Sequence, residues 1–211
     1  MDEQLIVDES QLRALLGEPA EAALNKERTS LHELDRQWLA ASPFALIATS
    51  GQDGACDVSP KGDPAGRLAH VLDERTIAVA ERPGNRRADG YRNILANPHV
   101  GLIFFIPGRT DTLRINGRAR LVRDAPWFGE MVVKGHRPLL AVVVDIDQVF
   151  HHCGKAFLRS ALWKPQTWSD PRFGDVPSRP VIAHTLERPG ESLADLEQYY
   201  GPSYEEKLYR S

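Results

Sequence analysis

The sequence has little or none of what defines several protein classes. Its two cysteines, Cys56 and Cys153, are too far apart for a disulfide framework or a zinc ribbon and favour free thiols in a reducing compartment. The first residues are acidic and have no apolar segment, so we expect no signal peptide. No apolar run is long enough to span a membrane. These features predict a cytoplasmic protein without a membrane anchor.

The chain also lacks a strong excess of charge. Its formal net charge is -3 over 211 residues, which argues against a general binder of nucleic acid or of membrane surfaces. Hydrophobic residues make up 42% and charged residues 26%, a balance that favours a packed core over disorder.

Familiar catalytic and metal-binding motifs are absent as well. There is no Gly-x-Ser-x-Gly elbow, no phosphate-binding Walker loop and no Rossmann glycine fingerprint. The run His151-His152-Cys153 concentrates metal-ligand types, but adjacent residues are poorly placed to bind one ion. We therefore expect no metal site, and no motif near Cys153 would orient it as a nucleophile.

What the chain does contain is a central series of apolar, alternating segments between two helical extensions. Residues 1–42 predict an extension with helices at 8–16 and 30–41, the second capped by Ser30 with Glu33. Residues 43–163 predict a barrel domain. The expected strands are 44–49, 55–59, 75–80, 99–106, 111–122 and 138–150, and the expected helices begin at Arg86 and span 124–134 and 153–163. Residues 164–211, rich in proline at first and partly helical later, predict an extension packed on the barrel. Parallel βαβ repetition is absent, so the pattern favours a small antiparallel barrel in a mainly β (α+β) fold.

The most informative segment is the turn at residues 81–87, Glu-Arg-Pro-Gly-Asn-Arg-Arg. It places Arg86 and Arg87 at the expected start of a helix, where the free N–H groups and the macrodipole favour anions over cations. A phosphate at this point would reverse the penalty, because the N–H groups and both guanidiniums would bind the same dianion. The alternative is that both arginines are solvated surface residues.

Two further groups are candidates for ligand contacts. Lys61 lies between Pro60 and Gly62 in an expected loop at 60–67, where Ser59 is also available to a ligand; both residues are equally compatible with an ordinary turn. On the expected helix 153–163, three side chains follow one face at intervals of four: Lys155, Arg159 and Trp163. This row could line an anionic aromatic ligand. It is equally compatible with a solvated helix face beside a core tryptophan.

Taken in order, these segments resemble the pyridoxamine 5′-phosphate oxidase-like, FMN-binding split-barrel family. The resemblance covers about residues 40–165 and rests on the Ser-Pro-Lys-Gly-Asp-Pro segment, the arginine turn, the helix that ends at Asn97-Pro98 and the strand pair that follows. The segment 151–163 is similar to a bacterial branch of FMN-dependent enzymes. The resemblance to this family implies a six-stranded antiparallel Greek-key split barrel with peripheral helices. It also implies a homodimer with FMN between its subunits.

The resemblance also implies a set of cofactor-binding residues. Arg86 and Arg87 match the basic pair that binds the FMN phosphate, and Ser59 and Lys61 match positions beside the ring and ribityl chain. The further matches are Val79, Ala80, Asn116, Arg118, Lys155, Arg159, Ser160 and Trp163.

The implied function is an FMN-dependent oxidoreductase that transfers a hydride to or from a small molecule. The tail lacks the arginine–histidine segment with which pyridoxamine phosphate oxidases hold the substrate phosphate, so oxidation of a B6 vitamer is not expected. Two alternatives remain open. One is a flavin carrier or sensor without catalysis, and the other is a split barrel that binds a deazaflavin, or haem through His151 or His152.

Overall fold

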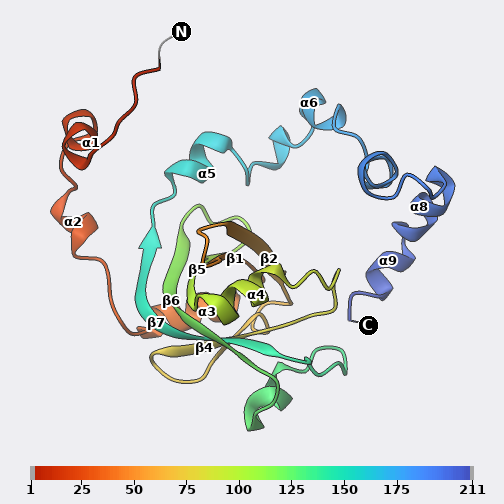
Figure 1. The fold of residues 1–211 in the computed structure, drawn as a ribbon, viewed down its shortest axis with the longest axis horizontal. Helices are drawn as coiled ribbons and strands as arrows, with labels where there is room; N and C mark the ends of the chain where they lie inside the picture. The colour runs from red at the N-terminus through yellow and green to blue at the C-terminus, as the bar shows by residue number, and fades with distance from the viewer. Residues whose placement is uncertain (1–2, 210–211) are drawn as a thin grey trace.

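The computed structural model describes residues 3–209, which are organised around one antiparallel sheet (Figure 1). The strands lie in the order β2-β1-β5-β6-β7-β4-β3, and every neighbouring pair is antiparallel. Their bounds are β1 Phe44–Ser50, β2 Cys56–Gly62, β3 Ala69–Val71, β4 Thr76–Ala80, β5 His99–Phe105, β6 Thr112–Val122 and β7 Ala141–His152.

The strongly curled sheet confirms the predicted fold class, a mainly β split barrel with peripheral helices. Among the described residues no pairing joins the edge strands β2 and β3, so the barrel is open. The structure has seven strands where six were expected, because the three-residue β3 carries too short a pattern to be recognised. The prediction of a loop at 60–67 is wrong for residues 60–62. Strand β2 continues through Pro60 to Gly62, since an edge strand tolerates a residue without an N–H.

The period-two pattern of β6 determines which side faces the core. Leu113 and Ile115 are fully buried, whereas Arg118 and Arg120 on the other face are exposed. Between Asn116 and Gly117 the pairing with β7 shifts by one residue, a β-bulge. A side chain at Gly117 would lie 2.1 Å from the Asp145 carbonyl oxygen, so the close approach of the two strands requires glycine here.

Two apolar clusters lie on opposite faces of β4. Ile77 and Val79 point into the main core inside the barrel, with Leu102, Phe104 and other side chains of the sheet. Ala78 and Ala80 face a smaller cluster around Phe128 and Met131. Strand β4 is therefore buried on both faces, which explains its uninterrupted apolar sequence.

The peripheral helices differ from the predicted ones at their ends. Helix α3, Glu33–Ala41, is capped by His32 with Asp35 rather than by Ser30 with Glu33. Residues 126–131 form a 3-10 helix, η1 (Pro126–Met131), in place of the longer helix expected at 124–134. Helix α4, Asp89–Ala96, packs on β1, β2 and β6 with Ile94 buried. Helix α5 covers only Lys155–Ser160.

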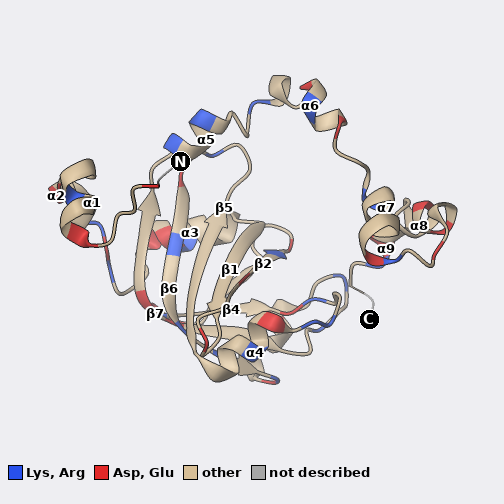
Figure 2. Ribbon diagram, turned by 45° about the horizontal axis from the view of Figure 1, so that its top comes forward, with Lys and Arg blue, Asp and Glu red and all other residues tan. Residues whose placement is uncertain are grey.

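The two extensions are largely exposed (Figures 1 and 2). Helices α1, Glu9–Leu16, and α2, Glu21–Leu24, bury no residue. After α5 the chain arcs away from the sheet and returns, with a small apolar centre at Ala183 and Leu196. Its elements are η2 Pro165–Thr167, α6 Pro171–Gly174, α7 Arg179–Ile182, η3 Ala183–Glu187, α8 Leu193–Tyr199 and α9 Ser203–Glu206. In residues 3–209, no helix combines the length and hydropathy needed to cross a bilayer.

Candidate functional site

A cavity of about 590 Å³ lies between strand β2, the loop after β4 and the start of α4. Five of the predicted cofactor-binding residues line it: Ser59, Lys61, Ala80, Arg86 and Arg87. They come from the edge strand β2, from the end of β4 and from the loop after β4, so the fold brings together segments almost thirty residues apart. The volume is within the range of about 300–1,000 Å³ that is common for small-molecule sites.

The loop at one end of the cavity corrects the predicted helix start. Helix α4 begins at Asp89, so Arg86 and Arg87 precede it and Ala88 is its N-cap. Arg86 and Ala88 adopt left-handed backbone conformations, with φ of 60° and 58°. Residues with a Cβ rarely adopt these angles, and such strain concentrates at binding sites. Left-handed residues in such a loop also turn successive N–H groups towards one side, which creates an anion-binding concavity.

Several donors at this turn are available to a ligand. The N–H groups of Ala88, Asp89 and Gly90 have no acceptor within the described residues. The Arg87 N–H donates to Asn85 Oδ1 at 3.0 Å, which fixes the shape of the loop. The described part of the chain also provides no carboxylate partner for Arg86. The turn therefore offers both free N–H groups and an unneutralised guanidinium.

Arg87 is at present paired with a carboxylate. Its Nε lies 2.7 Å from Asp89 Oδ2, and Arg92 contacts the other oxygen at 2.6 Å. The hydrogen bond from Arg87, more than that from Arg92, holds the pKa of Asp89 below its ordinary value. Both guanidiniums are 73% exposed in their side chains, so water screens the pairs and Arg87 can turn towards a stronger anion at little cost.

Lys61 occupies a second polar position of the cavity. Its Nζ donates to Glu81 Oε2 at 2.9 Å and to the Tyr91 hydroxyl oxygen at 2.7 Å. The ammonium is thus held in one place by partners from the loop after β4 and from α4. Sequence reasoning identified Lys61 but missed Glu81 and Tyr91, because the contacts span 20 and 30 residues.

A third group of polar side chains was also missed. Asn93 on α4 donates to Thr49 Oγ1 at 3.1 Å and to Asp57 Oδ2 at 2.8 Å, and these two partners line the cavity. The contacts attach α4 to the hairpin of β1 and β2. No local motif marks them, because each partner lies on a different element.

Seven predicted residues do not line this cavity. Val79 is buried in the core. On the sheet surface, Asn116 Nδ2 donates to Gln148 Oε1 at 2.7 Å, and Arg118 is exposed on the same strand. Lys155, Arg159 and Ser160 lie on α5, and Trp163 stacks on Phe157 at 6.0 Å between ring centroids. Their contact with a cofactor stays a prediction.

The expected stripe of Lys155, Arg159 and Trp163 is wrong at Trp163, whereas Lys155 and Arg159 do lie four residues apart on α5. Helix α5 ends at Ser160, and Ala161 turns the chain with a φ of 53°. Trp163 is therefore outside the helix. Its indole Nε1 is buried and has no hydrogen-bond partner among the described residues.

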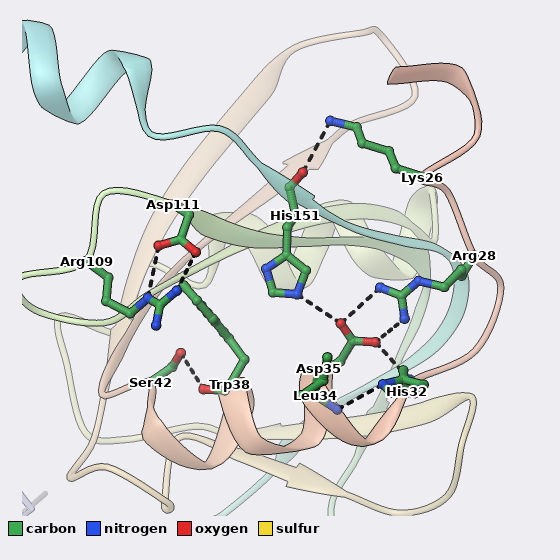
Figure 3. A network of polar contacts seen from close by, with 10 residues as sticks. All are labelled: Lys26, Arg28, His32, Leu34, Asp35, Trp38, Ser42, Arg109, Asp111 and His151. Carbon is green, nitrogen blue, oxygen red and sulfur yellow. Dashed lines mark hydrogen bonds and ion pairs between the residues drawn. The ribbon is translucent and has the colours of Figure 1, made fainter. Parts of the chain in front are cut away.

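A separate polar network surrounds Asp35, whose side chain is 1% exposed (Figure 3). Arg28 donates to both of its carboxylate oxygens, the His32 N–H lies 2.8 Å from Oδ2, and His151 Nε2 lies 3.1 Å from Oδ1. Burial opposes ionisation of Asp35, but the Arg28 guanidinium and the His32 N–H outweigh it and lower the pKa. This network attaches the N-terminal segment to the barrel, where Arg28 also pairs through its backbone with Val149.

The two histidines considered as haem ligands are placed differently. His151 lies between Asp35 and the edge of Trp38, with 5.1 Å between ring centroids. The pKa of His152 is lowered by burial and by the nearby charges of Lys26 and Arg114. Neither lines the 590 Å³ cavity. In residues 3–209 no three His, Cys, Asp or Glu side chains gather in a way that could hold a metal ion.

Comparison with known proteins gives a family match over residues 31–153, to the model described as pyridoxamine 5′-phosphate oxidase. No curated protein matches the chain. Among solved structures, a candidate pyridoxamine 5′-phosphate oxidase from Lactobacillus delbrueckii is 24% identical, with 59% of this chain and 98% of that chain covered and a TM-score of 0.46. HupZ from Group A Streptococcus is 16% identical (57% and 93% covered, TM-score 0.46). An FMN-binding protein from Syntrophomonas wolfei is 11% identical (57% and 89% covered, TM-score 0.43).

Proposed function

Because the chain belongs to the pyridoxamine 5′-phosphate oxidase family, with more than half of its residues matched, we propose that it binds FMN in the 590 Å³ cavity. The observation that carries this proposal is the turn at Arg86–Ala88, where free N–H groups and two guanidiniums meet at one end of the cavity. This arrangement suits a phosphate dianion, whose three oxygens accept charge-assisted hydrogen bonds.

The rest of the cavity fits the remainder of such a ligand. Polar side chains at Ser59, Thr49 and Asp57 suit a chain of hydroxyl groups, and Lys61 supplies a fixed positive charge. Apolar walls come from Ile47, Leu68 and Ile94. Positive charge beside a flavin ring stabilises its anionic reduced form. The Lys61 ammonium would supply such a charge, although the Glu81 carboxylate 2.9 Å away offsets part of it.

The proposed activity is that of an oxidoreductase acting on a small molecule. Bound FMN would supply a ring that accepts or donates a hydride. The protein would orient the ring, exclude water from one face and hold the phosphate. The described residues offer no compelling general acid or base, and hydride transfer does not require one.

We propose further that the protein is a homodimer with the cofactor between its subunits. The support is the exposure of apolar side chains on both extensions, including Leu15, Leu16, Trp168 and Phe173, which are 55–73% exposed. A second copy would cover such surface, as large apolar patches on soluble proteins mark interaction sites. Light scattering should give the mass of a dimer, and a monomer that retains FMN would contradict the shared site.

The direct test is the identity of the chromophore and its dependence on Arg87. Purified protein should be yellow and release FMN when denatured. Arg87→Ala should give folded protein with about tenfold to a hundredfold weaker FMN binding, because one charge-assisted hydrogen bond contributes about 1.5–3 kcal/mol.

A matched control is available at Arg92, which is equally exposed and also pairs with Asp89 but does not line the cavity. Arg92→Ala should retain the flavin. Full occupancy in Arg87→Ala, or equal losses in both variants, would refute the phosphate assignment. Yellow protein that no pyridine nucleotide or trial substrate reduces would favour a flavin carrier.

A further inference from the structure

The C-terminal extension is attached to the barrel at its two ends and arcs away from the sheet between them (Figure 1). At its start, Phe157 of α5 packs on Phe105 of β5, with ring centroids 5.9 Å apart. Within the described chain, no hydrogen bond or ion pair joins residues 164–208 to a residue before Ala161. The extension regains a hydrogen bond to the barrel at Tyr209.

Tyr209 fastens the far end of the extension. Its hydroxyl donates to Asp63 Oδ1 at 2.8 Å, and Arg82 Nε donates to the other oxygen of that carboxylate at 2.7 Å. The guanidinium of Arg82 and the ammonium of Lys134 lie over the Tyr209 ring, and the His136 ring stacks on it. These contacts form the C-terminal tether.

The tether resists opening because its acceptor is buried. The Asp63 side chain is only 2% exposed, and among the described residues Tyr209 is the one donor to its Oδ1. A buried carboxylate oxygen that loses its donor costs free energy until water reaches it. The tether therefore favours a closed position of the extension, and its loss shifts the population towards an open one.

The tether lies next to the walls of the proposed flavin cavity. Asp63 directly follows β2, and Arg82 belongs to the loop that continues into the arginine turn. Residues 81–87 of this loop also line a second cavity of about 1460 Å³, and the end of the extension, including Tyr204, Lys207 and Tyr209, lines it as well. The phosphate end of the proposed flavin site thus faces the space that the extension encloses.

We propose that the C-terminal extension is a gate for the cofactor, which the tether holds closed over the arginine turn. When Tyr209 leaves Asp63, the extension moves away from the turn about its attachment at α5, and FMN enters or leaves at the phosphate end. Segments that open in this way have few stabilising contacts, and residues 164–178 are mostly exposed. The inference rests on the proposed function, because the gate controls exchange of the cofactor assigned to that site.

The test compares FMN exchange in native protein and in Tyr209→Phe, which lacks only the hydroxyl. Stopped-flow fluorescence after mixing flavin-stripped protein with FMN gives the association rate constant, and dilution of loaded protein gives the dissociation rate constant. Both should rise about fivefold, the equivalent of one hydrogen bond of about 1 kcal/mol. Their ratio, the dissociation constant, should stay unchanged, because Tyr209 does not line the smaller cavity.

Tyr204→Phe is the matched control. Tyr204 belongs to the same extension and lines the larger cavity, but its hydroxyl makes no hydrogen bond within residues 3–209, so both rate constants should keep their native values. Equal rate constants in native protein and Tyr209→Phe would overturn the inference. So would equal rises in the two variants, or a rise in the dissociation rate constant alone, which would make Tyr209 a binding residue and not part of a gate.

Limited digestion with trypsin measures opening without FMN. Cleavage after Lys207 requires the surrounding chain to leave the tether, so it should be about fivefold faster in Tyr209→Phe. Cleavage after Arg172, an exposed residue of the same extension outside the tether, should keep its native rate. Unchanged cleavage after Lys207 would also overturn the inference. Native protein that takes up no FMN refutes the flavin site, whereas bound FMN that exchanges equally fast in native protein and Tyr209→Phe refutes the gate alone.

Discussion

Replacement of Asp35 by asparagine should destabilise the protein by about 2–3 kcal/mol. The native carboxylate accepts from Arg28, the His32 N–H and His151, and hydrogen bonds to charged groups contribute about 1.5–3 kcal/mol each. The sum is an overestimate, because the side chains of Arg28 and His151 are 36% and 35% exposed and water would replace part of what they lose. Of the expected loss, about 1 kcal/mol comes from the hydrogen bond that the Asp35 carboxylate accepts from the His32 N–H at the start of α3.

The assay is thermal and urea unfolding followed by circular dichroism. For a chain of this length, about 2–3 kcal/mol corresponds to a fall in Tm of about 4–12 °C. Asp145→Asn is the matched control, because Asp145 also pairs with an arginine, Arg120, but both side chains are more than half exposed. That control should lose at most about 1 kcal/mol.

The dependence on pH provides a second check. The folded-state pKa of Asp35 is lowered, so its contribution to the free energy of unfolding is fully present above the unfolded value of about 3.9 and is lost as the pH falls through the folded value. The stability difference between native protein and Asp35→Asn should therefore shrink in acid. A loss below about 0.5 kcal/mol at neutral pH, or a difference that grows in acid, would refute the assigned role of this carboxylate.

Two further predictions concern the barrel and the C-terminal tether. Gly117→Ala should abolish folding or cost several kcal/mol of stability, because its Cβ would lie 2.1 Å from the Asp145 carbonyl oxygen. The control Gly129→Ala should be nearly neutral, because a Cβ there meets no atom within 4 Å. Soluble yield and unfolding curves compare the two variants. Burial, followed by the hydrogen bond to Asp63, raises the pKa of Tyr209, so its contribution to stability is present below the unfolded value of about 10 and is lost as the pH rises above it. Tyr209→Phe should cost about 1 kcal/mol near neutral pH, with a deficit that disappears in alkali; a deficit that persists there would contradict the tether.

The sequence predicted the strands well, because their pattern is local. Strand β6 alternates buried and exposed residues as expected, strand β5 is apolar after its first residue, and strand β7 begins with the apolar run Ala141–Val144. The errors lie where a distant partner decides the outcome. His32 replaces Ser30 as the cap of α3 because Asp35 is bound by Arg28 and His151, and the latter lies 116 residues away.

The candidate site was predicted in part for the same reason. The arginine turn and Lys61 are visible as local motifs, and both line the cavity. The backbone conformation of the turn was not visible, since nothing local indicates that Arg86 and Ala88 adopt left-handed angles before helix α4 starts at Asp89. Glu81 and Tyr91, which hold Lys61, are recognisable only once β2, β4 and α4 are brought together.

The measurement that tests the central claim most directly compares FMN with riboflavin, which differ only in the phosphate. Native protein stripped of flavin should bind FMN more tightly by a factor on the order of 10² to 10⁴, the equivalent of two charge-assisted hydrogen bonds. In the double variant Arg86→Ala, Arg87→Ala this preference should fall to about tenfold or less, while the affinity for riboflavin stays unchanged. An undiminished preference for FMN in the double variant would contradict the account.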